Sequence, residues 1–67
     1  MNESVRAAYG GVKFTIEVKP IGDAFKCAWA CERCGKRVEH DAAFADFADA
    51  LATARLAART HALVHRK

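Results

Sequence analysis

The chain has 67 residues, 52% of them hydrophobic, and a formal net charge of +3 at pH 7. A chain this short forms at most one domain, and it buries so little apolar surface that a metal, disulfides or a partner often contribute to its stability. It contains no apolar run long enough to cross a membrane and no secretory signal pattern, and its modest positive charge permits a nucleic-acid partner without requiring one.

Residues 1–11 are mostly polar or small and end in Gly10 and Gly11. We expect them to form a flexible N-terminal arm, followed by a single domain over residues 12–67. Hydrophobic and polar residues alternate strictly in the next segment, "VKFTIEVK" at 12–19. This period of two is typical of a half-buried β-strand.

The alternation resumes in "AFKCAWAC" at 24–31, after the turn-forming segment "PIGD" at 20–23. One face of this second predicted strand carries Phe25, Cys27, Trp29 and Cys31. We expect the two strands to pair as an antiparallel hairpin, and "KRVEH" at 36–40 could add a short third strand.

The remaining segment is rich in alanine and lacks glycine and proline, which favours a helix. We predict one long helix from Ala42 to Arg66, with Asp41 as its N-cap. The fold class is therefore α+β, with an antiparallel hairpin packed on one long C-terminal helix.

Residues at steps of three and four define one face of the predicted helix, and its members are Phe44, Phe47, Leu51, Ala54, Ala58, His61 and His65. The first five should pack against the strands. The two histidines are four positions apart, so their side chains are neighbours on the helix surface.

The chain runs away from the turn "CERC" in an extended segment, and the predicted helix then returns over a roughly similar length. This return brings the two histidines back beside the cysteines. We therefore predict a closed tetrahedral site formed by Cys31, Cys34, His61 and His65. Zinc suits this mixture of thiolates and imidazoles best. Gly35 fits a turn whose backbone amides point at thiolate sulfurs.

These features resemble a divergent Cys2His2 zinc finger. Two strands, "CERC", a helix and "HALVH" follow one another over residues 12–65, which resembles that family except that the cysteine turn follows the second strand and does not link the two strands. The family has about twelve residues between the second cysteine and the first histidine, whereas twenty-six separate Cys34 from His61 here. The helix also starts with the acidic and apolar "DAAFADF", so base readout from that end does not carry over.

Other interpretations of these residues stay open at the level of sequence. "CERC" could be a redox dithiol or a disulfide, and His40 could replace one helical histidine. Cys27 lies about 13 Å from Cys31 along a regular strand, so we expect a buried core thiol. If Cys27 were a ligand and His65 were not, the site would be Cys3His.

Basic residues flank both halves of the predicted site. We predict a basic pole that contacts the phosphates of DNA or RNA, formed by Arg33, Lys36, Arg37, Arg66 and Lys67. Acidic residues are expected toward the other end of the molecule, namely Glu39, Asp41, Asp46 and Asp49. A solvated surface with charges matched to the helix dipole is the simpler alternative.

A second apolar stripe on the helix consists of Ala45, Ala52, Leu56 and Leu63, with Ala57 and Val64 nearby. A domain of this size has little left to cover Leu56 and Leu63, which indicates a homodimer or a protein partner.

We expect a protein without enzymatic activity, because four protein ligands leave zinc no open position for water. The odd number of cysteines favours a reducing compartment, the cytoplasm. The function predicted first is nucleic-acid binding, associated with transcription, through the basic pole. The alternative is a protein-interaction or homodimerising module in which zinc is purely structural.

Overall fold

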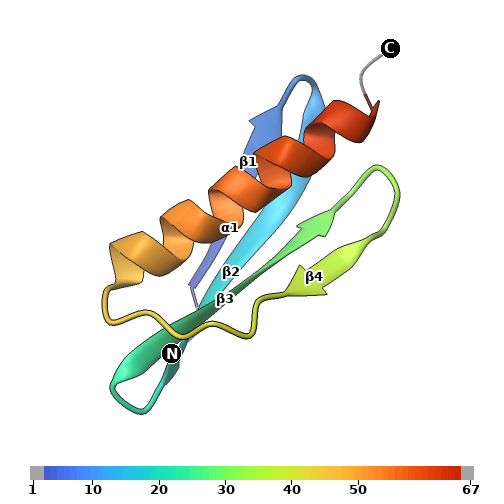
Figure 1. Cartoon of the computed structure of the whole chain (residues 1–67). Coiled ribbons are helices and arrows are strands. Elements are labelled where there is room, and N and C mark those ends of the chain that lie inside the picture. Colours follow the sequence, from blue (N-terminus) through green and yellow to red (C-terminus); the bar gives the residue numbers. More distant parts are fainter. Residues whose placement is uncertain (1–2, 66–67) are drawn as a thin grey trace.

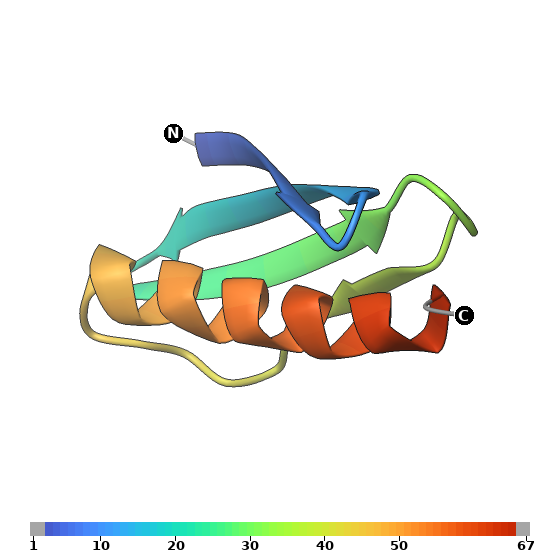
Figure 2. The same ribbon diagram turned by 90° about the horizontal axis from the view of Figure 1, so that it is seen from above.

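The computed structural model describes residues 3–65 and has two layers, an antiparallel sheet and one helix that crosses its face (Figures 1 and 2). The sheet has the strand order β1-β2-β3-β4. Its strands are β1 (Glu3–Tyr9), β2 (Val12–Ile21), β3 (Ala24–Cys31) and β4 (Arg37–Glu39), followed by α1 (Phe47–Ala62) and the 3-10 helix η1 (Leu63–His65). The predicted α+β class is confirmed. None of the helices described is long and apolar enough to cross a membrane.

The predicted hairpin and the short third strand are both present. β2 pairs antiparallel with β3, and β3 pairs antiparallel with β4. Every second residue of β2 and β3 faces α1, and the buried members of this face are Val12, Phe14, Ile16, Val18, Cys27, Trp29 and Cys31. Phe14 lies opposite Cys31 in the ladder, so the core begins directly beside the cysteine turn.

The prediction of a flexible arm over residues 1–11 was wrong for residues 3–11. Glu3–Tyr9 forms β1, which pairs with β2 from Glu3 opposite Val18 to Tyr9 opposite Val12. Gly10 and Gly11 have φ of 58° and 82°, and a two-residue hairpin turn with positive φ at both positions matches the right-handed twist of the strands. The domain therefore includes this strand and does not begin at Val12.

The helix is shorter than predicted at both ends. It begins at Phe47 rather than Ala42, and its N-cap is Asp46, whose side chain makes no capping hydrogen bond. Phe44 instead extends the sheet, because its backbone exchanges two hydrogen bonds with Phe25, of 2.7 and 2.8 Å. These bonds hold the preceding segment in an extended conformation. At the other end the α-helix gives way to η1, and Arg66 lies outside the described residues.

The face that α1 buries consists of small residues, namely Ala50, Ala54, Ala58 and Ala62. Alanine lets the helix axis approach the large aromatic side chains of the sheet closely. The predicted stripe is rotated relative to this face, since Phe47 is 36% exposed and packs its ring against Phe25 at a centroid distance of 6.0 Å. Leu51 and Ala57 are partly buried beside the alanines, so Ala57 belongs to the core and not to the outer surface.

Candidate metal centre

The turn after β3 places both cysteines at one end of the sheet. Cys31 is the last residue of β3 and is buried, whereas Cys34 is exposed in the turn that leads to β4. The backbone closes this turn with two hydrogen bonds, from the Cys31 N–H to the Lys36 carbonyl at 2.7 Å and from the Gly35 N–H to the Cys31 carbonyl at 2.9 Å.

Gly35 has a φ of 78°, a left-handed conformation that L side chains rarely adopt. A Cβ added at this position would meet no atom within 4 Å, so the glycine is required by the backbone conformation and not by crowding. The turn thereby folds back and lets the N–H groups of Arg33 and Cys34 approach the Cys31 sulfur.

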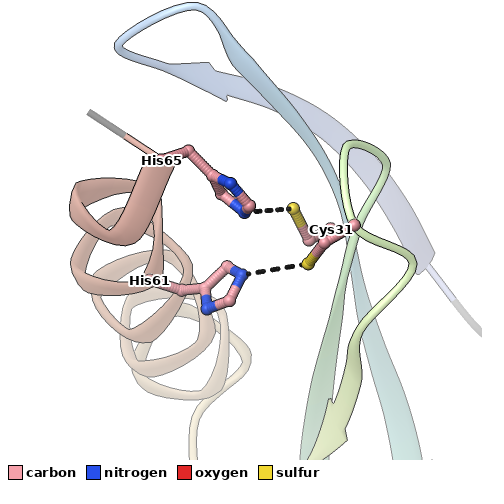
Figure 3. A group of neighbouring side chains, drawn as sticks. Cys31, His61 and His65 are labelled. Atoms are coloured by element: carbon pink, nitrogen blue, oxygen red, sulfur yellow. Dashed lines mark hydrogen bonds between the residues drawn. The ribbon is translucent and has the colours of Figure 1, made fainter. Parts of the chain in front are cut away.

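The histidines come from the end of the helix that lies beside this turn (Figure 1). His61 stands in the last turn of α1 and His65 ends η1, with their ring centroids 5.1 Å apart. Both rings point from the helix toward the cysteine sulfurs (Figure 3). The 3-10 turn tightens the chain after Ala62 without carrying His65 away from His61.

The four donor atoms form a compact cluster, with all of them within 4.8 Å of one another. The Cys34 Sγ lies 3.4 Å from the His61 Nε2, and the Cys31 Sγ lies 3.6 Å from the His65 Nε2. Two ligands on one tetrahedral zinc, at a Zn–S distance of about 2.3 Å and a Zn–N distance of about 2.0–2.1 Å, lie about 3.6 Å apart. The sulfur–nitrogen spacing therefore suits a tetrahedral ion of this size.

The surroundings favour the protonation states that a metal requires. Burial raises the pKa of the Cys31 thiol, but the N–H groups of Cys34 and Arg33, the Cys34 side chain and the Arg33 charge outweigh it, so the pKa falls below its ordinary value. Burial lowers the pKa of His61, and the charges of His65 and Lys36 lower it further. A lowered pKa favours the thiolate of Cys31 and the neutral imidazole of His61, which are the forms that bind metals.

Aromatic side chains form the inner wall of the site. The His61 ring lies 5.0 Å from the Trp29 ring and 6.1 Å from the Phe14 ring, measured between centroids. The alternation at 12–19 and 24–31 placed Phe14 and Trp29 on the apolar faces of the two predicted strands but did not identify them as part of the site. Their position could have indicated it, because Trp29 precedes Cys31 by two residues on the same face and Phe14 is its cross-strand neighbour.

His40 and Cys27 do not belong to the cluster of donor atoms found among residues 3–65. The His40 N–H donates to the Cys27 carbonyl at 2.9 Å, which places both residues along β3 away from Cys31. The His40 Nε2 is buried and has no hydrogen-bond partner in the described part of the chain. Cys27 is 2% exposed, and burial raises the pKa of its thiol, partly offset by the Ala54 backbone. Cys27 is therefore the core thiol that the sequence predicted.

The charged residues around the site are less segregated than the predicted basic pole requires. The Arg37 guanidinium forms ion pairs with the carboxylates of Glu17, at 3.1 Å, and Glu39, at 3.5 Å. A further acidic residue, Glu32, lies in the cysteine turn itself and pairs with Arg6 at 3.1 Å.

Arg33 and Lys36 are exposed and make no ion pair within residues 3–65. Arg66 and Lys67 lie outside the described residues. The structure thus leaves Arg33 and Lys36 as the described members of the predicted pole that have no carboxylate partner.

A comparison of the chain with models of known protein families, with curated proteins and with solved structures found no match. The resemblance to a Cys2His2 zinc finger therefore depends on the four ligand residues and on the order of the elements that carry them.

Proposed function

We propose that the protein is a small zinc-binding domain in which Cys31, Cys34, His61 and His65 hold one Zn²⁺ and the ion has a structural role. The observation that carries this proposal is the spacing of the four donor atoms, two sulfur–nitrogen pairs at 3.4 and 3.6 Å within one cluster. Two thiolates and two imidazoles suit zinc better than magnesium or calcium, which prefer oxygen ligands.

The structural role follows from what the ion would connect. It would join the end of β3 to the end of α1, two elements whose packing otherwise depends on alanines on the helix side, with Leu51 partly buried beside them and Phe47 packed against Phe25. Alanine buries little apolar area, so the helix gains little free energy from the sheet alone. A structural zinc contributes about 10–16 kcal/mol in small zinc-binding peptides, which is of the size that such a domain needs.

Native mass spectrometry with circular dichroism tests this proposal. The purified protein should carry one zinc per chain, and removal of the metal by a strong chelator should abolish most of its helical signal. Adding zinc back should restore that signal, whereas magnesium should not. A protein that contains no zinc, or that keeps its full helical signal and thermal stability without metal, would refute the structural role.

We also propose a second function for the same end of the molecule, contact with the phosphates of DNA or RNA through Arg33 and Lys36. The observation that favours it is their exposure without carboxylate partners on the turn beside the metal site. Phosphate contacts of this kind release counterions and carry no sequence information.

Filter binding or fluorescence anisotropy with labelled DNA and RNA over a range of salt concentrations tests this second function. Arg33→Glu with Lys36→Glu should weaken binding to all sequences alike and lower the slope of log K against log salt by about two. Lys19→Glu, near the opposite end of the sheet, is the matched control and should change binding little. Absence of binding by the wild-type protein at low salt would exclude this function.

A further inference from the structure

The outward face of α1, continued into η1, carries a line of exposed residues. They follow one another at steps of three and four, and they are Asp49, Ala52, Leu56, Arg59 and Leu63. This line lies on the opposite side of the helix from the buried alanines, and none of residues 3–65 covers it. Leu56 is 63% exposed and Leu63 is 57% exposed, which is unusual for two large aliphatic side chains on one line.

The spacing of this line is that of a coiled-coil seam, in which apolar residues recur at alternating steps of three and four. Asp49, Leu56 and Leu63 take the first position of the repeat, whereas Ala52 and Arg59 take the fourth. When two such helices pack in opposite directions, each first position lies opposite a fourth position of the partner helix.

An antiparallel pair with its two-fold axis midway between Ala52 and Leu56 makes residues 49–59 of this seam self-complementary, whereas Leu63 lies opposite position 45, before α1 begins. Asp49 of each copy lies opposite Arg59 of the other, because 49 and 59 are equally distant from that axis. Leu56 lies opposite Ala52, so the largest side chain of the central layers meets the smallest. A parallel pair would instead place Asp49 against Asp49 and Arg59 against Arg59.

We propose that two copies of this chain associate through an antiparallel pairing of their α1 helices, with Asp49 of each copy bound to Arg59 of the other. Within residues 3–65 neither Asp49 nor Arg59 makes an ion pair in its own chain, so both charges are free for the partner. The same surface serves both copies, as a two-fold interface requires. The pairing uses the face of the helix away from the metal site, so it does not depend on the bound ion's identity.

Sedimentation equilibrium of the zinc-loaded protein with charge-reversal variants tests this proposal. The wild-type protein should dimerise with a dissociation constant below about 1 mM. Asp49→Arg places two arginines opposite each other at both ends of the seam, and Arg59→Asp does the same with two aspartates. Each variant alone should dissociate at least about tenfold more readily, because like charges facing each other across an interface are strongly unfavourable.

A mixture of the two variants tests whether residues 49 and 59 lie in the interface, whereas the loss of association in each variant alone distinguishes the antiparallel from the parallel pairing. Mixing Asp49→Arg chains with Arg59→Asp chains restores an opposite charge at both contacts, so the mixture should form heterodimers while each variant alone stays monomeric. Leu56→Glu should abolish association, whereas Ile21→Glu, which replaces a 50% exposed aliphatic residue at the end of β2, should not. A monomeric wild-type protein, or a mixture that fails to associate, overturns the proposal.

Discussion

Cys31 and His65 are 34 positions apart in the chain, yet the Cys31 Sγ lies 3.6 Å from the His65 Nε2. This contact depends on three elements at once: the end of β3, the length of α1 and the 3-10 turn that follows it. The parallel contact between Cys34 and His61, at 3.4 Å, is made one helical turn earlier. Together they place four potential metal ligands at the end of a sheet and helix that are packed on each other along their length.

The ligand residues should be separable from the other cysteine and histidine by substitution. Cys34→Ser or His65→Ala should abolish tight zinc binding, because each removes one of four donor atoms. Cys27→Ala and His40→Gln should keep one zinc per chain, and Cys27→Ala should cost roughly 1–3 kcal/mol of stability through loss of core packing. Zinc content is measured by native mass spectrometry. Loss of zinc in Cys27→Ala but not in His65→Ala would indicate a Cys3His site instead.

Substitution of Gly35 should reveal the backbone conformation of the cysteine turn. Gly35→Ala should lower stability by roughly 1–2 kcal/mol, since its φ of 78° is left-handed and the cost of that conformation falls on any residue with a Cβ. Gly35→Asn should cost less, because asparagine tolerates this region better than alanine. Chemical denaturation of the zinc-loaded variants measures both values, and equal stability of Gly35→Ala and the wild type would contradict the turn described.

Acidification should release zinc only below the ordinary histidine range. The pKa of Cys31 and the pKa of His61 are both lowered, so protons compete with the metal for these two ligands less than they would for an ordinary cysteine and histidine. Above its lowered pKa each group is deprotonated and can bind the metal. As the pH falls through that pKa, the group takes up a proton and no longer binds. Zinc occupancy should therefore stay constant from about pH 8 to about pH 6.5 and fall at lower pH. A decline that begins above neutral pH, measured with a zinc indicator, would contradict these shifts.

The fluorescence of Trp29 should report on the metal. Trp29 is the chain's only tryptophan, and its ring lies 5.0 Å from the His61 ring. Binding of Co²⁺, a paramagnetic ion that accepts the same tetrahedral ligands, should quench this fluorescence strongly, whereas Zn²⁺ should not. The Cys34→Ser variant is the control and should show no saturable quenching by Co²⁺. Quenching that is identical in the variant and the wild type would place the ion elsewhere.

Much of this arrangement was predictable from local patterns. The strict alternation at 12–19 and 24–31 identified β2 and β3, and it placed Cys31 on the face that the helix covers. The spacing of His61 and His65 predicted that both imidazoles leave the helix on one side. The length of a helix then sufficed to bring them beside the cysteine turn, even though its first residues were assigned wrongly.

The errors arose where tertiary contacts override local preference. Alanine-rich sequence predicted a helix from Ala42, but the paired hydrogen bonds between Phe44 and Phe25 keep this segment extended until Asp46. β1 was missed because its alternation of apolar and polar residues is incomplete. Its inward residues are Val5, Ala7 and Tyr9, but the outer face between Ala7 and Tyr9 also carries an apolar residue, Ala8. The Gly10–Gly11 pair was the available signal, since two such glycines between alternating segments favour a tight hairpin.

The predicted basic pole failed in part because sequence alone does not show which charges face each other. Glu17 and Arg37 are 20 positions apart in the chain, but the sheet register brings their side chains to 3.1 Å. Arg6 of β1 and Glu32, which follows β3, likewise meet across the intervening strand β2. Only the pairing of the strands reveals that these charges balance each other on the outer face of the sheet.

X-ray absorption spectroscopy at the zinc edge measures directly which atoms surround the bound ion. The purified protein should show two sulfur neighbours at about 2.3 Å and two nitrogen neighbours at about 2.0–2.1 Å around one zinc. This shell corresponds to the thiolates of Cys31 and Cys34 and the imidazoles of His61 and His65. A shell with three sulfurs, or with oxygen in place of an imidazole nitrogen, would contradict this ligand set. A purified protein that retains no zinc would contradict the zinc site itself.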